Sequence, residues 1–214
     1  MPAAMHGNKA EARAVPSPLL KALCRKFWWP PYALLRDQES APADASILTR
    51  HFLEEFSRGN EFGGSKLAFL RLRTGMFGAL NSFLASGGAR ASAYQSTLDL
   101  SEPGPVPADA ESRMGIISAG VSAPGDAFRR RWALVTLDSA LAELRRECVE
   151  AGRLAEFEAL KPGLARRQAT TDDVNSDDPL TAFRARFQKL TLEEVSQTVS
   201  TPAELDAEFR ELFD

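Results

Sequence analysis

The sequence has few of the residues that build metal, redox or catalytic centres. Its 214 residues include only two cysteines and two histidines, and Cys24 and Cys148 form no CxxC pattern. Neither His6 nor His51 has a second ligand at metal-binding spacing, so we expect buried, reduced thiols, no metal site and no cofactor. The sequence also lacks a P-loop, a dinucleotide-binding glycine pattern and a nucleophile elbow, so we expect that the protein is not an enzyme.

Long hydrophobic runs are absent as well. No segment approaches the length of an apolar membrane span. The first fifteen residues mix Lys9, Glu11 and Arg13 with small residues and lack the apolar core of a signal peptide. We therefore expect a cytoplasmic protein without a membrane partner.

An excess of positive charge is missing too, because the formal net charge is −3. Binding to nucleic acid would therefore depend on local basic patches. Residues 65–90 contain Lys66, Arg71, Arg73 and Arg90 without any acidic residue, whereas acidic residues outnumber basic ones in 171–214. Charge favours DNA binding only in the middle of the chain.

Apolar residues recur at helical spacing through most of the chain. The longest such stretch is 126–164, where the spacing predicts a long amphipathic helix that follows Pro124-Gly125 and ends near Gly152. A short second helix with Leu154, Phe157, Leu160 and Leu164 on one face follows it, so this stretch predicts a helical hairpin. The apolar side of the long helix is predicted to contain Leu134, Leu137, Leu141, Leu144 and Cys148.

Further helices are predicted from Ser17 to the Pro30-Pro31 break, from about Pro42 to Phe56, and over 66–85. Near the C-terminus, Phe183, Phe187 and Leu190 share a helix face, and a capping box at 201–204 predicts the start of a last helix. Trp28, Trp29 and Tyr32 are expected to pack across the proline break. The sequence thus predicts an all-α protein.

The composition also predicts a domain organisation. Residues 1–16 are expected to be a flexible leader, 17–95 one helical domain and 126–214 a second. Residues 96–125 are rich in Pro, Gly, Ser and Ala, a composition typical of a linker.

Blocks in both predicted domains resemble a known family. Arg130-Arg131-Trp132-Ala133-Leu134, Leu144-Arg145-x-Glu147, Ala151-Gly152 and Phe157-Glu158-Ala159-Leu160-Lys161-Pro162 resemble the start of domain four in bacterial extracytoplasmic-function (ECF) RNA polymerase sigma factors. Leu23-Cys24-Arg25-Lys26-Phe27-Trp28 and the segment from Ser40 to Leu53 resemble sigma domain two, and 193–213 is similar to the C-terminal extension of the family. The resemblance implies that 17–95 is a sigma domain two-like unit and 126–214 a sigma domain four-like unit.

The resemblance also implies partners. In the family, the second helix of domain two binds the clamp of the largest polymerase subunit, and Asp44, Leu48, Thr49 and Phe52 occupy that helix here. Ile47 and Arg50 depart from the family pattern, which has an aspartate and a glutamine at these positions. Core RNA polymerase is therefore the expected protein partner, and an anti-sigma protein is a further one.

Promoter DNA is the other implied partner. Arg71, Arg73 and Arg90 lie where the family melts and reads the upstream promoter element, and Arg184, Arg186 and Lys189 resemble the end of its recognition helix. A solvated charged surface remains the alternative interpretation of both groups.

Two functions follow. The first is an ECF sigma factor that binds core polymerase and directs promoter-specific transcription initiation. However, 168–182 is short and acidic compared with a DNA-reading helix-turn-helix, and its aspartates would repel phosphates. The alternative is therefore a degenerate sigma-like protein that binds polymerase or another protein without reading a promoter.

Overall fold

A computed structural model of the chain describes residues 18–38, 40–59, 71–85, 110–116, 123–164 and 178–213. These residues are mostly helical, which confirms the all-α prediction, and their one β pairing is an isolated bridge between Arg71 and Val199. None of the described helices combines the length and apolar composition needed to cross a lipid bilayer. The helices are α1 (Pro18–Lys26), α2 (Trp29–Asp37), α3 (Pro42–Gly59), α4 (Leu72–Ala85), the 3₁₀ helix η2 (Ala110–Ile116), α5 (Pro124–Glu150), α6 (Leu154–Leu164), α7 (Pro179–Ser196) and α8 (Pro202–Phe213).

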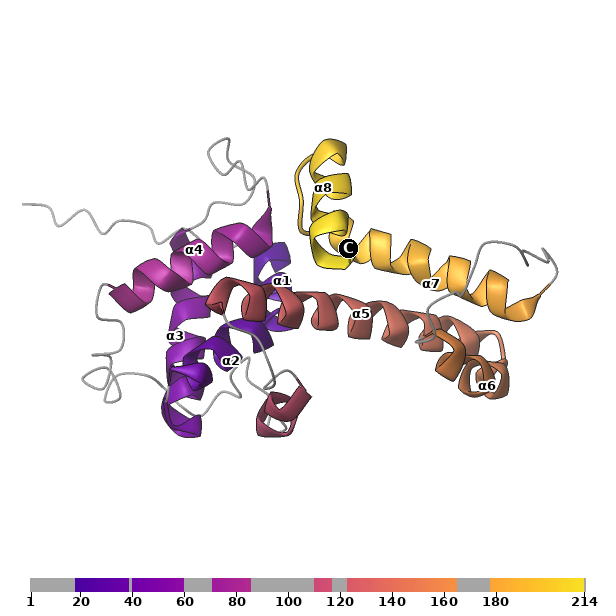
Figure 1. The fold of residues 1–214 in the computed structure, drawn as a ribbon, viewed down its shortest axis with the longest axis horizontal. Coiled ribbons are helices and arrows are strands. Elements are labelled where there is room, and N and C mark those ends of the chain that lie inside the picture. The colour runs from indigo at the N-terminus through magenta and orange to yellow at the C-terminus, as the bar shows by residue number, and fades with distance from the viewer. Residues whose placement is uncertain are drawn as a thin grey trace, which may run out of the picture.

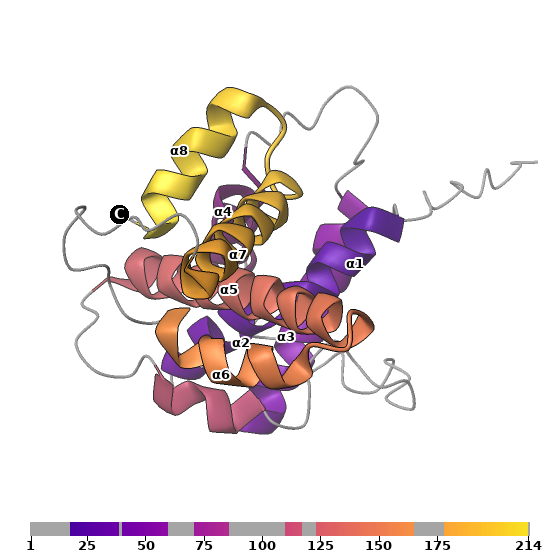
Figure 2. The same cartoon turned by 90° about the vertical axis from the view of Figure 1, so that its right-hand side faces the viewer.

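Helix α5 is the axis of the molecule. Its 27 residues span about 40 Å at the usual rise of an α-helix. Helices α1 to α4 gather around its first half, while α6 and α7 pack against its second half (Figure 1). Viewed from that second end, α6 and α7 lie on opposite sides of α5 (Figure 2). Helix α8 stands beside the first half of α5, on the same side as α4.

The first half of α5 completes a large aromatic core. Trp132 is fully buried and stacks on Phe27, the residue after α1, with ring centroids 3.9 Å apart. The ring of Phe128 lies beside it, with centroids 6.0 Å apart. Burying an aromatic side chain of this size contributes roughly 1.5–3 kcal/mol. The cluster also contains the buried apolar residues of α2, α3 and α4, so α5 joins these helices into one core.

The second half of α5 forms a separate, smaller core with α6 and α7. Phe157 of α6 meets Phe183 of α7 edge-on, with ring centroids 6.0 Å apart. Ala140, Leu144 and Cys148 supply the α5 side of this cluster, and Leu190 supplies a second contact from α7. Two buried clusters therefore share a single helix.

The predicted long helix is present, but its start and its buried face differ from expectation. It begins at Pro124 rather than after Gly125, because proline lacks only an N–H that the first turn of a helix leaves unpaired. Leu144 and Cys148 are buried as predicted, whereas Leu134, Leu137 and Leu141 are half-buried. Partners on several sides of α5 bury a wider set, including Phe128, Trp132 and Val135.

The proline pair acts differently from expectation. Pro30 and Pro31 lie inside the first turn of α2, and the break falls earlier, between Lys26 and Trp29. Helix starts tolerate proline for the reason given above. The predicted aromatic packing is confirmed, since Trp28 and Tyr32 are buried with their rings 5.8 Å apart.

Other predicted boundaries agree closely with the described residues. Helix α3 begins at Pro42, and the reciprocal capping box is present, because Glu204 N donates to Thr201 Oγ1 at 3.3 Å and Thr201 N donates to the Glu204 carboxylate at 3.0 Å. Helix α7 begins earlier than the predicted face, at Pro179. Its N-cap Asp178 accepts a hydrogen bond from Leu180 N. The predicted residues 66–70 lie outside the described part of the chain.

A piece of the predicted linker packs against the first cluster. Ala110 of η2 is buried there, and Glu111 accepts hydrogen bonds from Tyr32 Oη and, at 2.8 Å, from Arg36 Nε. The hydrogen bond from Arg36, followed by that from Tyr32, lowers the pKa of Glu111 to about 2. Burial and the neighbouring Glu111 raise the pKa of Tyr32 to about 12. Residues 110–116 are thus tied to α2.

Candidate functional site

The helix expected to bind polymerase uses most of its expected contact residues internally. Leu48, Thr49 and Phe52 are buried, and the Thr49 hydroxyl donates to the Ala45 carbonyl at 2.6 Å. Asp44 is exposed in the first turn of α3. Of the four predicted residues, only Asp44 lies on a surface that a partner reaches in this conformation.

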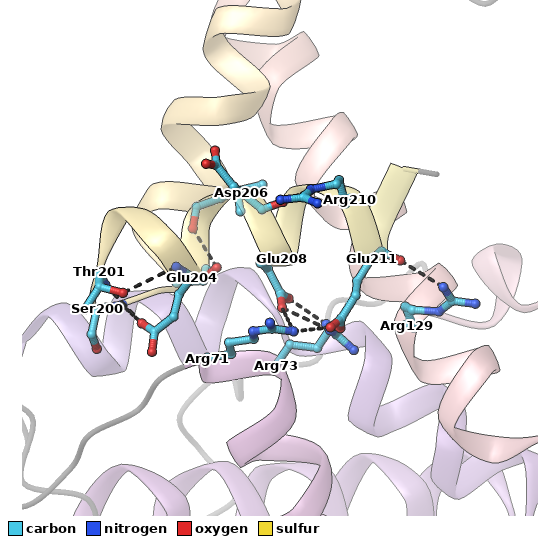
Figure 3. A network of polar contacts seen from close by, with 12 residues as sticks. Arg71, Arg73, Arg129, Ser200, Thr201, Glu204, Asp206, Glu208, Arg210 and Glu211 are labelled. Atoms are coloured by element: carbon cyan, nitrogen blue, oxygen red, sulfur yellow. Dashed lines mark hydrogen bonds and ion pairs between the residues drawn. The ribbon is translucent and has the colours of Figure 1, made fainter.

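The arginines at the start of α4 lie under α8 (Figure 3). Arg73 Nε donates to Glu208 Oε1 at 2.6 Å and Arg73 Nη2 donates to Glu208 Oε2 at 3.0 Å, which makes a bidentate pair. The Glu208 side chain is 0% exposed and that of Arg73 is 11% exposed. Arg73, a predicted DNA contact, is therefore held in a largely buried ion pair. Its partner Glu208 lies 135 residues later in the sequence.

Two further arginines contact the same helix. Arg71 pairs with Glu211, and its Nη1 lies 3.6 Å from Glu208 Oε2. Arg129 of α5 donates from Nη1 to the main-chain carbonyl of Glu211 at 2.9 Å. We call Arg71, Arg73 and Arg129 the arginine cluster, and Glu208 with Glu211 the carboxylate pair.

Electrostatics keep this contact charged. Burial disfavours the charged form of Arg73, but the hydrogen bonds and negative charges of Glu208 and Glu211 outweigh it and raise the pKa of Arg73. Hydrogen bonding from Arg71 is the main cause that lowers the pKa of Glu211. Backbone contacts add to the attachment, since Leu72 N donates to the Thr198 carbonyl at 2.8 Å.

The basic residues expected on the recognition helix are also engaged. Arg184 donates to the Gly163 carbonyl at 2.8 Å from Nη2, and Arg186 forms a bidentate pair with Glu147 of α5. The hydrogen bond from Arg186 is the main cause that lowers the pKa of Glu147. Lys189 is exposed, and Arg90 lies outside the described residues. Of the three basic residues on α7, Arg184 and Arg186 are half-buried and contact other parts of the protein, and Lys189 is exposed.

The sequence did not indicate three polar contacts that join distant helices. Arg131, whose side chain is 3% exposed, donates to both carboxylate oxygens of Asp37 at 2.6 and 3.0 Å. Lys26 of α1 pairs with Glu194 of α7 at 2.5 Å, and Arg36 pairs with Glu111. No signal in a single sequence marks such partners, because they are far apart in the chain.

The chain offers no metal centre in the part that the structure describes, where no three His, Cys, Asp or Glu side chains gather suitably. Cys24 and Cys148 are buried, unpaired thiols, as predicted, and burial raises the pKa of Cys24 to about 12. Among protein families, curated proteins and solved structures, nothing matches this chain. The arrangement of charges is therefore the main guide to function.

Proposed function

We propose that this chain is a sigma-like protein that binds RNA polymerase, in the bacterial cytoplasm, without reading a promoter. Its role is recognition, and catalysis belongs to the polymerase. The order of the resembling blocks supports the polymerase as partner. One structural observation supports the absence of promoter reading, namely that Arg71, Arg73, Arg184 and Arg186 all donate to acceptors within the chain.

The pairing matters because DNA affinity grows with the number of phosphates that a protein neutralises. An arginine that already holds a carboxylate gains little by exchanging it for a phosphate, since both offer two oxygens to the same fork of donors. On α7 only Lys189 is exposed among the expected contacts. One cation is too few for a sequence-reading helix, which also needs side chains that reach base edges.

Capture of purified core polymerase by the tagged full-length chain tests the proposed partner. Asp44 is the exposed member of the expected contact set, so Asp44→Lys should weaken capture at least tenfold. Asp206→Lys makes the same charge change on the exposed face of α8 and should leave capture unchanged. If both variants and the native chain capture polymerase equally, α3 is not part of the interface. If the native chain captures no polymerase, the proposal is refuted.

Promoter-directed initiation as an ECF sigma factor is the second candidate. It is favoured by the convergence of Arg71 and Arg73 at the start of α4, in the region that melts promoters in the resembling family. Transcription with reconstituted holoenzyme separates the two candidates. We expect no promoter-dependent transcript, and a discrete transcript that depends on an upstream sequence would establish the second candidate instead.

A further inference from the structure

The arginine cluster and α8 face each other in a way that points to a second function. Arg71 just before α4, Arg73 within α4 and Arg129 of α5 converge on one face of α8 (Figure 3). Arg71 and Arg73 donate to the carboxylates of Glu208 and Glu211, while Arg129 donates to the Glu211 main-chain carbonyl and to Asp126 of its own helix. We propose that the arginine cluster is a latent binding surface for the phosphate backbone of DNA, and that α8 is a lid whose carboxylate pair occupies it. This inference goes beyond the proposed function, because it requires no polymerase.

The lid is separable from the cores. The one fully buried side chain described in α8 is the carboxylate of Glu208. Leu205, Phe209 and Leu212 are half-buried, and Leu212 is the residue of α8 that packs against the first cluster. Because the buried members of both clusters lie outside α8, the lid can leave while the aromatic core and the α6–α7 core persist.

Helix α8 is also stabilised by contacts within its own first turn. The capping box at Thr201 and Glu204 satisfies the first turn of α8 without help from other helices. Charged contacts dominate its attachment, and added salt weakens those that solvent reaches. Opening should therefore move α8 as a helical unit and expose the three arginines together.

The chemistry of the covered surface matches phosphate. Guanidinium groups bind carboxylate and phosphate oxygens through the same paired N–H donors, so the carboxylate pair imitates two backbone phosphates. Three arginines predict a slope of about −2.7 in a plot of log affinity against log salt concentration. An acidic protein surface is the competing occupant, and the experiment below separates it from DNA.

The test uses the full chain with Glu208→Gln and Glu211→Gln together. Both changes keep the side-chain shape and remove the negative charges that pair with Arg71 and Arg73. Fluorescence anisotropy of a labelled 20-base-pair DNA duplex, titrated at 50 to 200 mM salt, should show at least tenfold tighter binding than the native chain at 50 mM. The slope should steepen by about two to three, in line with the three arginines.

Two controls define the surface. Asp206→Asn removes a charge from the same helix, but this side chain points away from the arginines, so affinity should change less than twofold (Figure 3). Adding Arg71→Ala and Arg73→Ala to the open-lid variant should return binding to the native level. A gain that persists in that quadruple variant would place the DNA elsewhere and overturn the proposal.

A second variant guards against misfolding of the double glutamine chain. Thr201→Ala removes one half of the capping box and leaves every residue of the arginine cluster and carboxylate pair intact. Loss of the cap destabilises α8, so a larger fraction of the molecules has an open lid and DNA binding should tighten by about fivefold. Unchanged DNA binding in both variants, with native circular dichroism, would overturn the lid. Polymerase capture by the same variants tests the proposed function separately, and binding of an acidic peptide instead of DNA would assign the surface to a protein.

Discussion

The sharing of α5 by both hydrophobic clusters predicts that they unfold together. Trp132 and Leu144 are twelve residues apart on one continuous helix, about 18 Å along its axis. Trp132 belongs to the first cluster and Leu144 to the second. Separating the two clusters requires breaking α5 between them, so damage to either should lower the stability of both.

The magnitudes follow from burial. Trp132 is fully buried and its ring lies within 6° of parallel to that of Phe27, so Trp132→Ala should cost about 3–5 kcal/mol. Leu144→Ala should cost about 2–5 kcal/mol by the same reasoning. With a urea dependence of about 2.5 kcal/mol per molar, these losses lower the unfolding midpoint by about 1–2 M. Leu192→Ala, at an exposed position, should change stability by about 0.5 kcal/mol at most.

The positions of the tryptophans make the assay selective. Trp28, Trp29 and Trp132 all belong to the first cluster, so tryptophan fluorescence monitors that cluster, while far-ultraviolet circular dichroism monitors every helix. Coupled unfolding predicts that Leu144→Ala shifts both curves by the same amount. If Leu144→Ala shifted only part of the circular dichroism curve and left the fluorescence midpoint in place, the reasoning from the shared helix would be refuted.

Two further predictions concern backbone conformation and acid. Gly152 has φ +68° and Gly78 lies mid-helix in α4, and an added Cβ meets nothing within 4 Å at either. Gly152→Ala should lower the free energy of unfolding by about 1 kcal/mol, because alanine is strained at a positive φ. Gly78→Ala should raise it by about 0.5–1 kcal/mol, because glycine is unfavourable inside a helix. Thermal unfolding measures both changes, and equal effects of the two substitutions would refute the argument from backbone conformation. The pKa values of Glu111, Glu147 and Glu211 are lowered on folding, so their stabilisation is complete above about pH 4.5 and is lost as pH falls through the lowered values. The melting temperature should fall steadily below pH 4.5, and a flat profile down to pH 2.5 would contradict these ion pairs.

The parts of the fold that depend on neighbouring residues could be predicted from the sequence. Helical spacing predicted α5 and α6, and the capping box located the start of α8, because both signals lie within a few residues. The buried face of α5 could not be predicted from a single apolar stripe. A helix with partners on several sides buries more than one stripe, which explains the burial of Phe128 and Val135.

The basic residues show the other limit of sequence reasoning. The composition of 65–90 suggested either DNA contacts or a solvated surface for Arg71 and Arg73, and the structure has them in ion pairs with α8. Their partners Glu208 and Glu211 come more than 130 residues later, at a distance that no local pattern spans. A role in DNA binding stays a prediction that depends on movement of α8.

The cost of burying charge gives a reason to regard the pair between Arg73 and Glu208 as more than a structural contact. A buried ion pair often contributes little net stability, because removing two charges from water costs about as much as their attraction returns. Glu208→Leu alone should therefore destabilise the chain by about 3 kcal/mol, because Arg73 loses its buried partner and keeps only the half-exposed Glu211. Glu208→Leu combined with Arg73→Met should be within about 1 kcal/mol of the native chain. Urea unfolding of the native, single and double variants measures this difference. If the double variant is as unstable as the single one, the ion pair itself stabilises the fold. If the double variant is close to native stability, the ion pair is not needed for stability, and its remaining role is to control the position of α8.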